Sequence, residues 1–315
     1  MNNFAPAHTA NRPYDIIALD GVDMDLVMKV PRLPGHGEKE VAEFVGRLPG
    51  GPCANFACAV ARLGMRVASL ATVGEDVSGQ EIVADFAAYG VATEFILTKP
   101  GGVSPFTVIL IEPSGERSII VVPSFSSEYD DAYLQQVLAQ TRAVHTMPSP
   151  GARFNRMAQI ARANDVKVMI DVESSVGANR PVLEEMLGHV DIASFNERGL
   201  VASSGEAATI EGARKLLAYG PEMVLVTLGP RGSIAVTADE AHQVGGWQVD
   251  VQDTTGAGDT FNAAFLSRLL SGDSLAECLT FANAAAAIAV TGLGPRGNLP
   301  TITDVNQFLA ERQQE

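Results

Sequence analysis

The stretch DTTGAGDTF, residues 253–261, combines residue types that could bind and transfer an anionic group. Gly256, Ala257 and Gly258 allow a tight turn whose successive N–H groups point toward one place, at the start of an expected helix. Such a turn binds anions, and Asp259 would repel them unless its carboxylate has another task. Accepting a proton from an attacking hydroxyl is such a task. Taken alone, the same residues could also form an ordinary turn with a helix cap.

Two hydrophobic periods alternate along the chain and predict the elements that must position this turn. Near-continuous apolar runs are typical of strands covered on both faces. These runs include DIIAL, VASLATV, VKVMIDV, DIASF, MVLVTLG and SIAVT. Segments with apolar residues three to four apart lie between most of them, as expected of helices. These segments are 54–64, 79–90, 130–140, 154–164 and 209–220. The alternation predicts an α/β fold, a doubly wound, mostly parallel sheet in a three-layer αβα sandwich.

Two regions lack intervening helices and favour hairpins that form a small β-sheet lid. They span about 26–48 and about 104–124, the second around the turn EPSGER. No repeat or interdomain linker interrupts the chain, so residues 14–312 are predicted to form one domain that carries this lid. Residues 1–13 are polar and lack the apolar run of a signal peptide, which predicts a disordered tail.

Composition restricts the partners and the compartment. The 315 residues are 46% hydrophobic, enough for a large core, and 22 Lys and Arg face 37 Asp and Glu. The net charge of −15 repels nucleic acids and anionic membranes. Cys53, Cys58 and Cys278 match no disulfide or metal pattern, which favours a reducing compartment. The longest apolar run is too short to cross a bilayer. We expect a cytoplasmic protein without nucleic-acid or membrane partners.

Other nucleotide-binding motifs are absent or lack their context. The chain contains no Gly-Lys pair, so a Walker A loop is excluded. GLGPRG at 292–297 has the spacing of a dinucleotide-binding loop, but NLPT follows it in place of a helix. We therefore interpret this match as a coincidence, and an NAD-dependent oxidoreductase has no other support.

The DTTGAGDTF stretch and GGPCANFACAVARLG at 50–64 together resemble the two signature motifs of pfkB, or ribokinase-like, carbohydrate kinases. The resemblance covers about residues 14–310 in the family's order and spacing. It implies a ribokinase-like fold and transfer of the ATP γ-phosphoryl group to a sugar hydroxyl, with Mg²⁺. It also implies that transfer depends on positioning and charge stabilisation.

The resemblance assigns roles to the residues of the turn. Asp259 is implied to be the general base, and the amides of Gly256, Ala257 and Gly258 are implied to form an anion hole. Asp253, with its neighbour Thr254, lies where the family often builds a monovalent cation site, so K⁺ is a further expected cofactor.

The sugar site is carried over residue by residue. Asp25 in DGVDMDL matches a carboxylate that grips sugar hydroxyls, and Asp23 lies where a ribokinase has asparagine. A carboxylate accepts hydrogen bonds from two adjacent hydroxyls, which suits a polyol. Gly50 and Gly51 would let the backbone approach the sugar, and Asn55 would hydrogen-bond it. Simple capping roles remain open for Asp23 and Asn55.

The ATP site is carried over in the same way. Thr227, Gly229 and Asn283 match positions that line the nucleotide pocket. Asn196 in FNERGL matches the first residue of an Asn-x-x-Glu motif that organises magnesium, but Gly199 replaces the glutamate. Phosphates and water could still hold Mg²⁺. This departure leaves a sugar-binding regulatory pseudokinase open as an alternative.

The substrate is predicted less directly. Relatives without that glutamate include ketohexokinase-like and sulfofructose-kinase-like branches, which favours a free ketose or a related furanose. Ribose, 2-keto-3-deoxygluconate and nucleosides remain open. A phosphorylated sugar would need basic residues near the lid, where Lys29, Arg32 and Arg117 are candidates. The alternating lid strands leave an apolar face that a lone small sheet cannot bury, which predicts a homodimer through the lid.

Overall fold

The computed structural model describes residues 12–125, 127–149, 151–172 and 179–312. Its strands are β1 (Ile16–Leu19), β2 (Asp23–Lys29), β3 (Glu43–Gly50), β4 (Val67–Gly74), β5 (Ala92–Lys99), β6 (Phe106–Ile111), β7 (Arg117–Val122), β8 (Ala143–Thr146), β9 (Lys167–Val172), β10 (Ile192–Asn196), β11 (Met223–Thr227), β12 (Ser233–Thr237) and β13 (Ala241–Val244). Its helices are α1 (Pro52–Arg62), α2 (Val77–Tyr89), α3 (Asp131–Leu138), α4 (Ala152–Ala163), α6 (Arg180–Leu187), α7 (Glu197–Ser204), α8 (Ile210–Leu216), α9 (Ala257–Ser271), α10 (Leu275–Ala289) and α11 (Ile302–Arg312). Two 3₁₀ turns are η1 (Leu217–Tyr219) and η2 (Gly229–Arg231).

Nine of the described strands form the main sheet, in the order β13-β12-β11-β10-β9-β8-β1-β4-β5. From β11 to β5 every pair of neighbours is parallel. Strand β1 is apolar throughout because it is buried on both faces: Ile16 and Ala18 belong to one core cluster, and Ile17 and Leu19 belong to the other. Side chains alternate across a strand, so burial on both faces requires a continuous apolar run.

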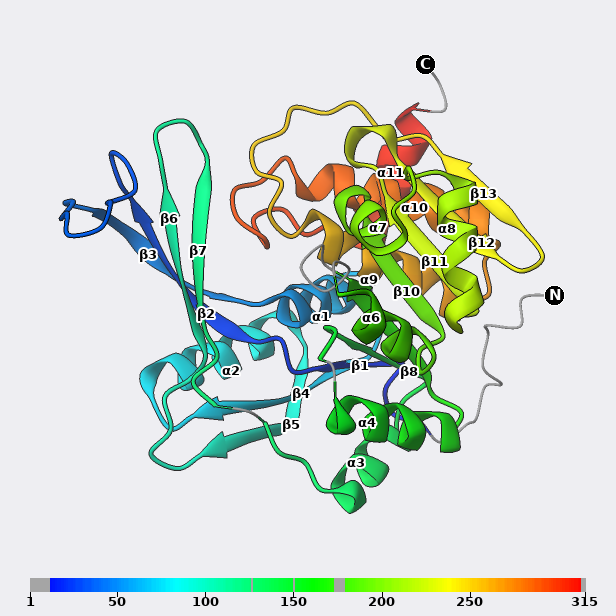
Figure 1. The fold of residues 1–315 in the computed structure, drawn as a ribbon, viewed down its shortest axis with the longest axis horizontal. Helices are drawn as coiled ribbons and strands as arrows, with labels where there is room; N and C mark the ends of the chain where they lie inside the picture. The colour runs from blue at the N-terminus through cyan, green and yellow to red at the C-terminus, as the bar shows by residue number, and fades with distance from the viewer. Residues whose placement is uncertain (1–11, 126, 150, 173–178, 313–315) are drawn as a thin grey trace.

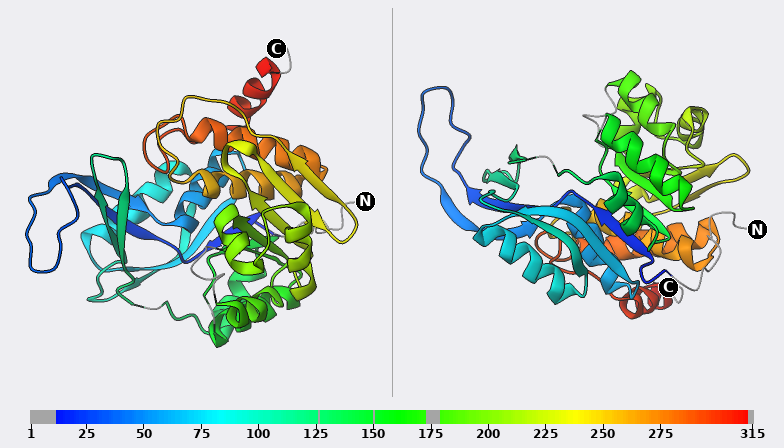
Figure 2. Two further views of the ribbon diagram at one scale, coloured as in Figure 1. Left: turned by 45° about the horizontal axis from the view of Figure 1, so that its top comes forward. Right: turned by 90° about the horizontal axis from the view of Figure 1, so that it is seen from below.

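Helices cover both faces of this sheet (Figure 1). One core cluster joins it to α1, α2, α9 and α10, and the other joins it to α3, α4, α6, α7 and α8. The right view of Figure 2 shows the two groups of helices on opposite sides of the strands. The predicted three-layer, mostly parallel fold is confirmed.

Strand β12, predicted as the run SIAVT, pairs with β11 in the antiparallel sense. Only the 3₁₀ turn η2 connects the two strands. A parallel neighbour would need a crossover of a dozen residues or more, so this short connection forces the chain to reverse. The parallel part of the sheet therefore ends at β11.

The remaining four described strands form a small sheet in the order β3-β2-β6-β7. It projects from the β4 and β5 side of the molecule in Figure 1, with the β2–β3 and β6–β7 turns at its far end. Strands β2 and β6 are parallel, and β3 and β7 flank them in antiparallel pairs. The second small sheet predicted from the hairpin segments is confirmed.

The N-terminal region is described only in part. The sequence predicts a disordered tail over residues 1–13, of which residues 1–11 lie outside the described residues. Arg12 donates hydrogen bonds to the carbonyl oxygens of Thr141, Asn164 and Asp165. In the described part of the chain, every helix is too short or too polar to cross a membrane.

Candidate active site

Helix α9 begins at the GAG turn, at the carboxyl-terminal edge of the main sheet. Gly256 is its N-cap, with a φ of 76°. A Cβ at Gly256 would lie 2.7 Å from the carbonyl oxygen of Pro295, so both the backbone angle and the contact require glycine. The first N–H groups of a helix have no intrahelical acceptor. One of them, on Ala257, donates to the Thr254 carbonyl at 3.3 Å. A helix start of this kind can bind an anion through its remaining first-turn N–H groups.

Asp259 lies in the first turn of α9, and its carboxylate faces helix α1. The Nδ2 group of Asn55 donates to Asp259 Oδ2 at 2.9 Å. Asn55 is buried, with 7% of its surface exposed. The N-cap of α1 is Gly51, and Asn55 lies inside the helix with its Nδ2 group on Asp259, so the capping alternative for Asn55 is wrong. The structure therefore joins the two motifs of the sequence through one hydrogen bond.

Asp23 and Asp25 lie two residues apart on β2, on the same face of the strand. Gly50 pairs with Asp23 in the register of β2 and β3. A Cβ at Gly50 would lie 2.2 Å from Asp25 Oδ2 and 3.1 Å from Asp23 Oδ1. At Gly51, whose φ is 95°, a Cβ would lie 2.3 Å from the Gly21 carbonyl oxygen. The two glycines thus make room for the carboxylates and for the neighbouring loop.

We call Asp23, Asp25 and Asp259 the carboxylate cluster. Burial raises the pKa of Asp23 to about 7, the charges of Asp25 and Asp259 add to this effect, and Arg296 opposes it. Burial also raises the pKa of Asp25, while a hydrogen bond from Thr107 and the charge of Arg296 lower it. Asp23 Oδ1 is buried and has no hydrogen-bond partner among the described residues. A hydroxyl donor from a ligand would satisfy this oxygen.

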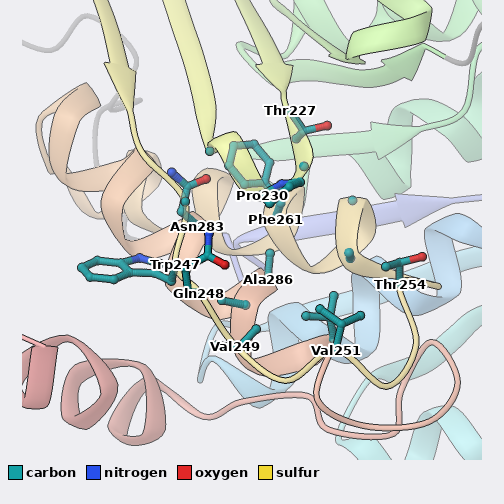
Figure 3. A pocket seen from close by; sticks show the side chains of 17 residues that line it. Thr227, Pro230, Trp247, Gln248, Val249, Val251, Thr254, Phe261, Asn283 and Ala286 are labelled. Carbon is teal, nitrogen blue, oxygen red and sulfur yellow. The ribbon is translucent and has the colours of Figure 1, made fainter.

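A cavity of about 290 Å³ lies on the other side of the GAG turn. Its lining includes Thr227, Gly229 and Asn283, the residues that the resemblance assigns to the nucleotide, together with Ala257 and Gly258. Figure 3 shows that much of the wall is apolar. The apolar side chains that the sequence analysis missed include Pro230, Trp247, Val249, Val251, Phe261 and Ala286. They come from separate segments, so no local pattern marked them.

The structure gives two predicted nucleotide residues well-defined contacts with the protein. Asn283 accepts from the Ser233 hydroxyl at 2.8 Å and donates to the carbonyls of Val244 and Gly245 at 3.2 Å. It thereby holds the β12–β13 wall of the cavity. Asn196 caps α7 by accepting from the Gly199 N–H at 2.7 Å. Gly199, which replaces the glutamate of the Asn-x-x-Glu motif, is therefore the residue whose N–H binds the Asn196 side chain.

The comparisons with known proteins agree with this geometry. A family model described as pfkB family carbohydrate kinase matches residues 14–302. The chain belongs to this family.

Individual relatives are ribokinases. The ribokinase of Haemophilus influenzae is 30% identical over 303 residues, 93% of this chain and 98% of the relative. That of Bacillus subtilis is 29% identical over 304 residues, 94% and 99% of the two chains. The structure of Arabidopsis thaliana ribokinase complexed with ribose and ATP superposes with a TM-score of 0.83. It is 27% identical, over 94% of this chain and 98% of that one. The predicted family and phosphotransferase activity are confirmed: the protein is an ATP-dependent sugar kinase.

A basic residue of the small sheet contacts the residues just before the GAG turn. Arg117 on β7 donates to the Thr255 hydroxyl, and its Nη1 lies 3.5 Å from Asp253 Oδ1. Asp253 also accepts from the N–H groups of Thr255 at 2.9 Å and Gly294 at 3.0 Å. Burial acts to raise the pKa of Asp253, but these hydrogen bonds lower it below the usual value. The Asp253 carboxylate therefore holds together three segments beside the GAG turn.

Two further residues of the kinase were not predicted from the sequence. Asp171, at the end of β9, accepts from Asn262 Nδ2 at 3.0 Å. Its Oδ2 lies 4.0 Å from the Cβ position of Gly258, which places an acidic group beside the GAG turn. Arg296, within the discounted GLGPRG motif, donates to Asn55 Oδ1 at 2.9 Å. The sequence could not indicate this contact, because Arg296 and Asn55 are far apart in the sequence and meet only in the folded chain.

Proposed function

We propose that this kinase phosphorylates a hydroxyl of a free sugar, a ketose or another sugar in its furanose form, with Asp259 as the general base. The observation that carries the proposal is the placement of Asp259. Its carboxylate is held by Asn55 in the first turn of α9, within electrostatic reach of Asp23. A sugar hydroxyl bound by the carboxylate cluster would lie beside this base, and the phosphoryl group would lie at the GAG turn.

The sugar end of the site supports a neutral acceptor. Asp23 and Asp25 bring two half-buried acidic groups together, and their negative charge would repel a phosphate placed there. Among the basic residues proposed for a sugar phosphate, Arg32 pairs with two glutamates of its own loop. Arg117 contacts Asp253 and Thr255 on the nucleotide side. Ribose, bound in the Arabidopsis relative, and a ketose are the leading candidates.

The proposal also covers the positions of ATP and Mg²⁺. ATP would occupy the cavity lined by Thr227, Gly229 and Asn283, with its phosphates at the amides of Gly256, Ala257 and Gly258. The described residues contain no group of three or more acidic, His or Cys side chains suited to hold a metal. We propose that Mg²⁺ arrives with the phosphates and neutralises their charge, with Asp171 and Asn196 as candidate protein groups near it.

A monovalent cation is a separate part of the proposal. The main-chain carbonyls of Asp253 and Thr254 would contribute to a K⁺ site beside the GAG turn. The position is supported by the hydrogen bonds from Thr255 and Gly294 that hold Asp253 in place. Comparing turnover in potassium and in lithium salts at equal ionic strength tests this part.

The small sheet is proposed to act as the lid of a single domain spanning residues 14–312. Its segments, about 26–48 and 104–124, would close over the sugar. Several of its large apolar side chains are exposed. They are Phe44, Val45 and Leu48 on β3 and Ile119, Ile120 and Val121 on β7. We propose that the same sheet of a second subunit covers those on one face of the sheet in a homodimer.

The decisive experiment replaces Asp259 with asparagine and measures ADP release with a panel of free sugars. General-base assistance is typically worth ~10²–10⁴-fold, so Asp259→Asn should lose most turnover while ATP binding is retained. Asp131→Asn is a matched control, because Asp131 is also an acidic residue in the first turn of a helix, α3. Turnover of Asp259→Asn within a few-fold of wild type would refute the base assignment.

The substrate class is tested on Asp25. Losing a charge-assisted hydrogen bond costs roughly 1.5–3 kcal/mol. Asp25→Ala should therefore raise the KM for the sugar about ten- to a hundredfold and leave the KM for ATP unchanged. Ketoses, aldopentoses, a sugar phosphate and adenosine form the panel. Preference for the phosphate or for adenosine would contradict the proposed acceptor without affecting the kinase assignment.

A further inference from the structure

Arg296 reaches into the site from the loop between α10 and α11. Its side chain is 8% exposed and lies between α1 and α2. Its Nη1 forms an ion pair with Asp85 of α2, and its Nε donates to Asn55 Oδ1 of α1 at 2.9 Å. The guanidinium carbon lies 6.0 Å from the centre of the Tyr89 ring. One arginine thus contacts two helices beside the site.

The loop that carries Arg296 is itself held against the GAG turn. Pro295 packs on Gly256, and the Gly294 N–H donates to Asp253 Oδ2 at 3.0 Å. The glycines of GLGPRG serve this compact shape: a Cβ at Gly297 would lie 2.0 Å from the Leu293 carbonyl oxygen. The tight local fold of the motif therefore positions the Arg296 side chain.

We propose that Arg296 is a positioning residue for phosphoryl transfer. Asp85 fixes its guanidinium, the guanidinium fixes the amide of Asn55, and the amide holds the carboxylate of Asp259. This inference rests on the proposed role of Asp259 as the base. It adds a requirement that lies outside the two sequence motifs.

The direction of the Asn55 amide explains why an arginine is needed. Arginine has only donors, so the Asn55 oxygen must face Arg296 and the NH₂ group must face Asp259. With the opposite orientation, the amide oxygen would face a carboxylate and two donors would face each other. The planar fork of arginine also allows Nε and Nη1 to bind Asn55 and Asp85 at once, which the single ammonium of lysine cannot reproduce.

The charge of Arg296 acts on the same site. It lowers the pKa values of Asp23 and Asp25, which burial raises. Removing the guanidinium would take away positive charge that offsets the negative charge of the carboxylate cluster. It would also leave the Asn55 amide free to turn. The expected consequence is a misplaced base, seen in turnover, with little effect on the cavity for ATP.

The test compares Arg296→Gln and Arg296→Lys with Arg142→Gln. Arg142 is a matched control: its side chain is also 8% exposed and pairs with an aspartate, Asp15. Each arginine also has one buried nitrogen without a partner among the described residues. Arg142 lies away from the site, so Arg142→Gln should lower Tm and leave kcat unchanged.

Both Arg296 variants should lower kcat about ten- to a hundredfold, as expected for a lost charge-assisted contact, with the KM for ATP unchanged. Equal kcat values for wild type and Arg296→Gln, or full rescue by lysine, would overturn the proposal. Asp85→Asn should reduce kcat by itself, and its effect should shrink in the Arg296→Gln background. Independent, additive effects of these two substitutions would also overturn it.

Asp259→Asn, assayed in the same panel, separates this inference from the proposed function. If Asp259→Asn keeps full turnover, the base assignment itself fails. If Asp259→Asn loses turnover and Arg296→Gln does not, only the role of Arg296 fails.

Discussion

Replacing Asp23 with asparagine should stabilise the protein at neutral and alkaline pH. The two side chains have nearly the same shape, so the substitution mainly removes a charge. Burial raises the pKa of Asp23 from 3.8 to about 7, so the folded state resists its ionisation. This interval corresponds to at most about 4 kcal/mol of unfolding free energy. The charges of Asp25 and Asp259 contribute to the cost, and Arg296 offsets part of it.

The sign of the pH dependence follows from proton binding. Between pH 3.8 and about 7 the folded protein holds a proton on Asp23 that the unfolded chain has lost. Wild-type stability from this group is therefore fully present below pH 3.8 and is lost as pH rises through 7. Asparagine does not titrate. The stability difference, Asp23→Asn minus wild type, should be near zero at pH 4 and reach its maximum above pH 7.

Urea denaturation of both proteins at several pH values between 4 and 8.5 measures this difference. Working with the difference matters, because His145 titrates in the opposite direction and partly masks Asp23 in the wild type. Asp239→Asn, in the exposed β12–β13 turn, is the control for removing a surface carboxylate. A stability difference that does not change with pH, or a destabilised Asp23→Asn at pH 8, would refute the argument.

Three other predictions concern the turn, the lid and a buried histidine. Gly256→Val should abolish most turnover, because its Cβ would clash with Pro295; Gly272→Ala, at the open C-cap of the same helix, should cost stability and leave kcat intact. Sedimentation at micromolar concentration should show a dimer, and Ile120→Asp should yield a monomer; a fully active wild-type monomer would contradict the proposed lid contact. Burial lowers the pKa of His145 to about 3, so its stabilising effect is present above pH 6.5 and is lost as pH falls toward 3. His145→Leu should therefore lose less stability than wild type between pH 7 and pH 5, and urea curves that fall in parallel would argue against this.

The architecture was predictable because it is encoded in short-range patterns. Apolar runs such as DIIAL are buried on both faces, and each predicted helix has its apolar spacing within one segment. The GAG turn was predictable for the same reason: Gly256 must have a positive φ and lies directly before the helix it caps. These features depend on neighbours in the sequence, where periodicity and turn chemistry act.

The arrangement of the site was decided by packing between distant segments. The Asn55–Asp259 contact joins residues 204 positions apart, and the Asn55–Arg296 contact spans 241 positions. No local period reports such pairs, so the sequence analysis interpreted GLGPRG as a coincidental match and could not place its arginine. The ionisation of Asp23 likewise depends on the tertiary structure. Burial and the charges of Asp25 and Asp259 raise its pKa, and the charge of Arg296 lowers it; of these, burial, Asp259 and Arg296 act on Asp23 only in the folded chain.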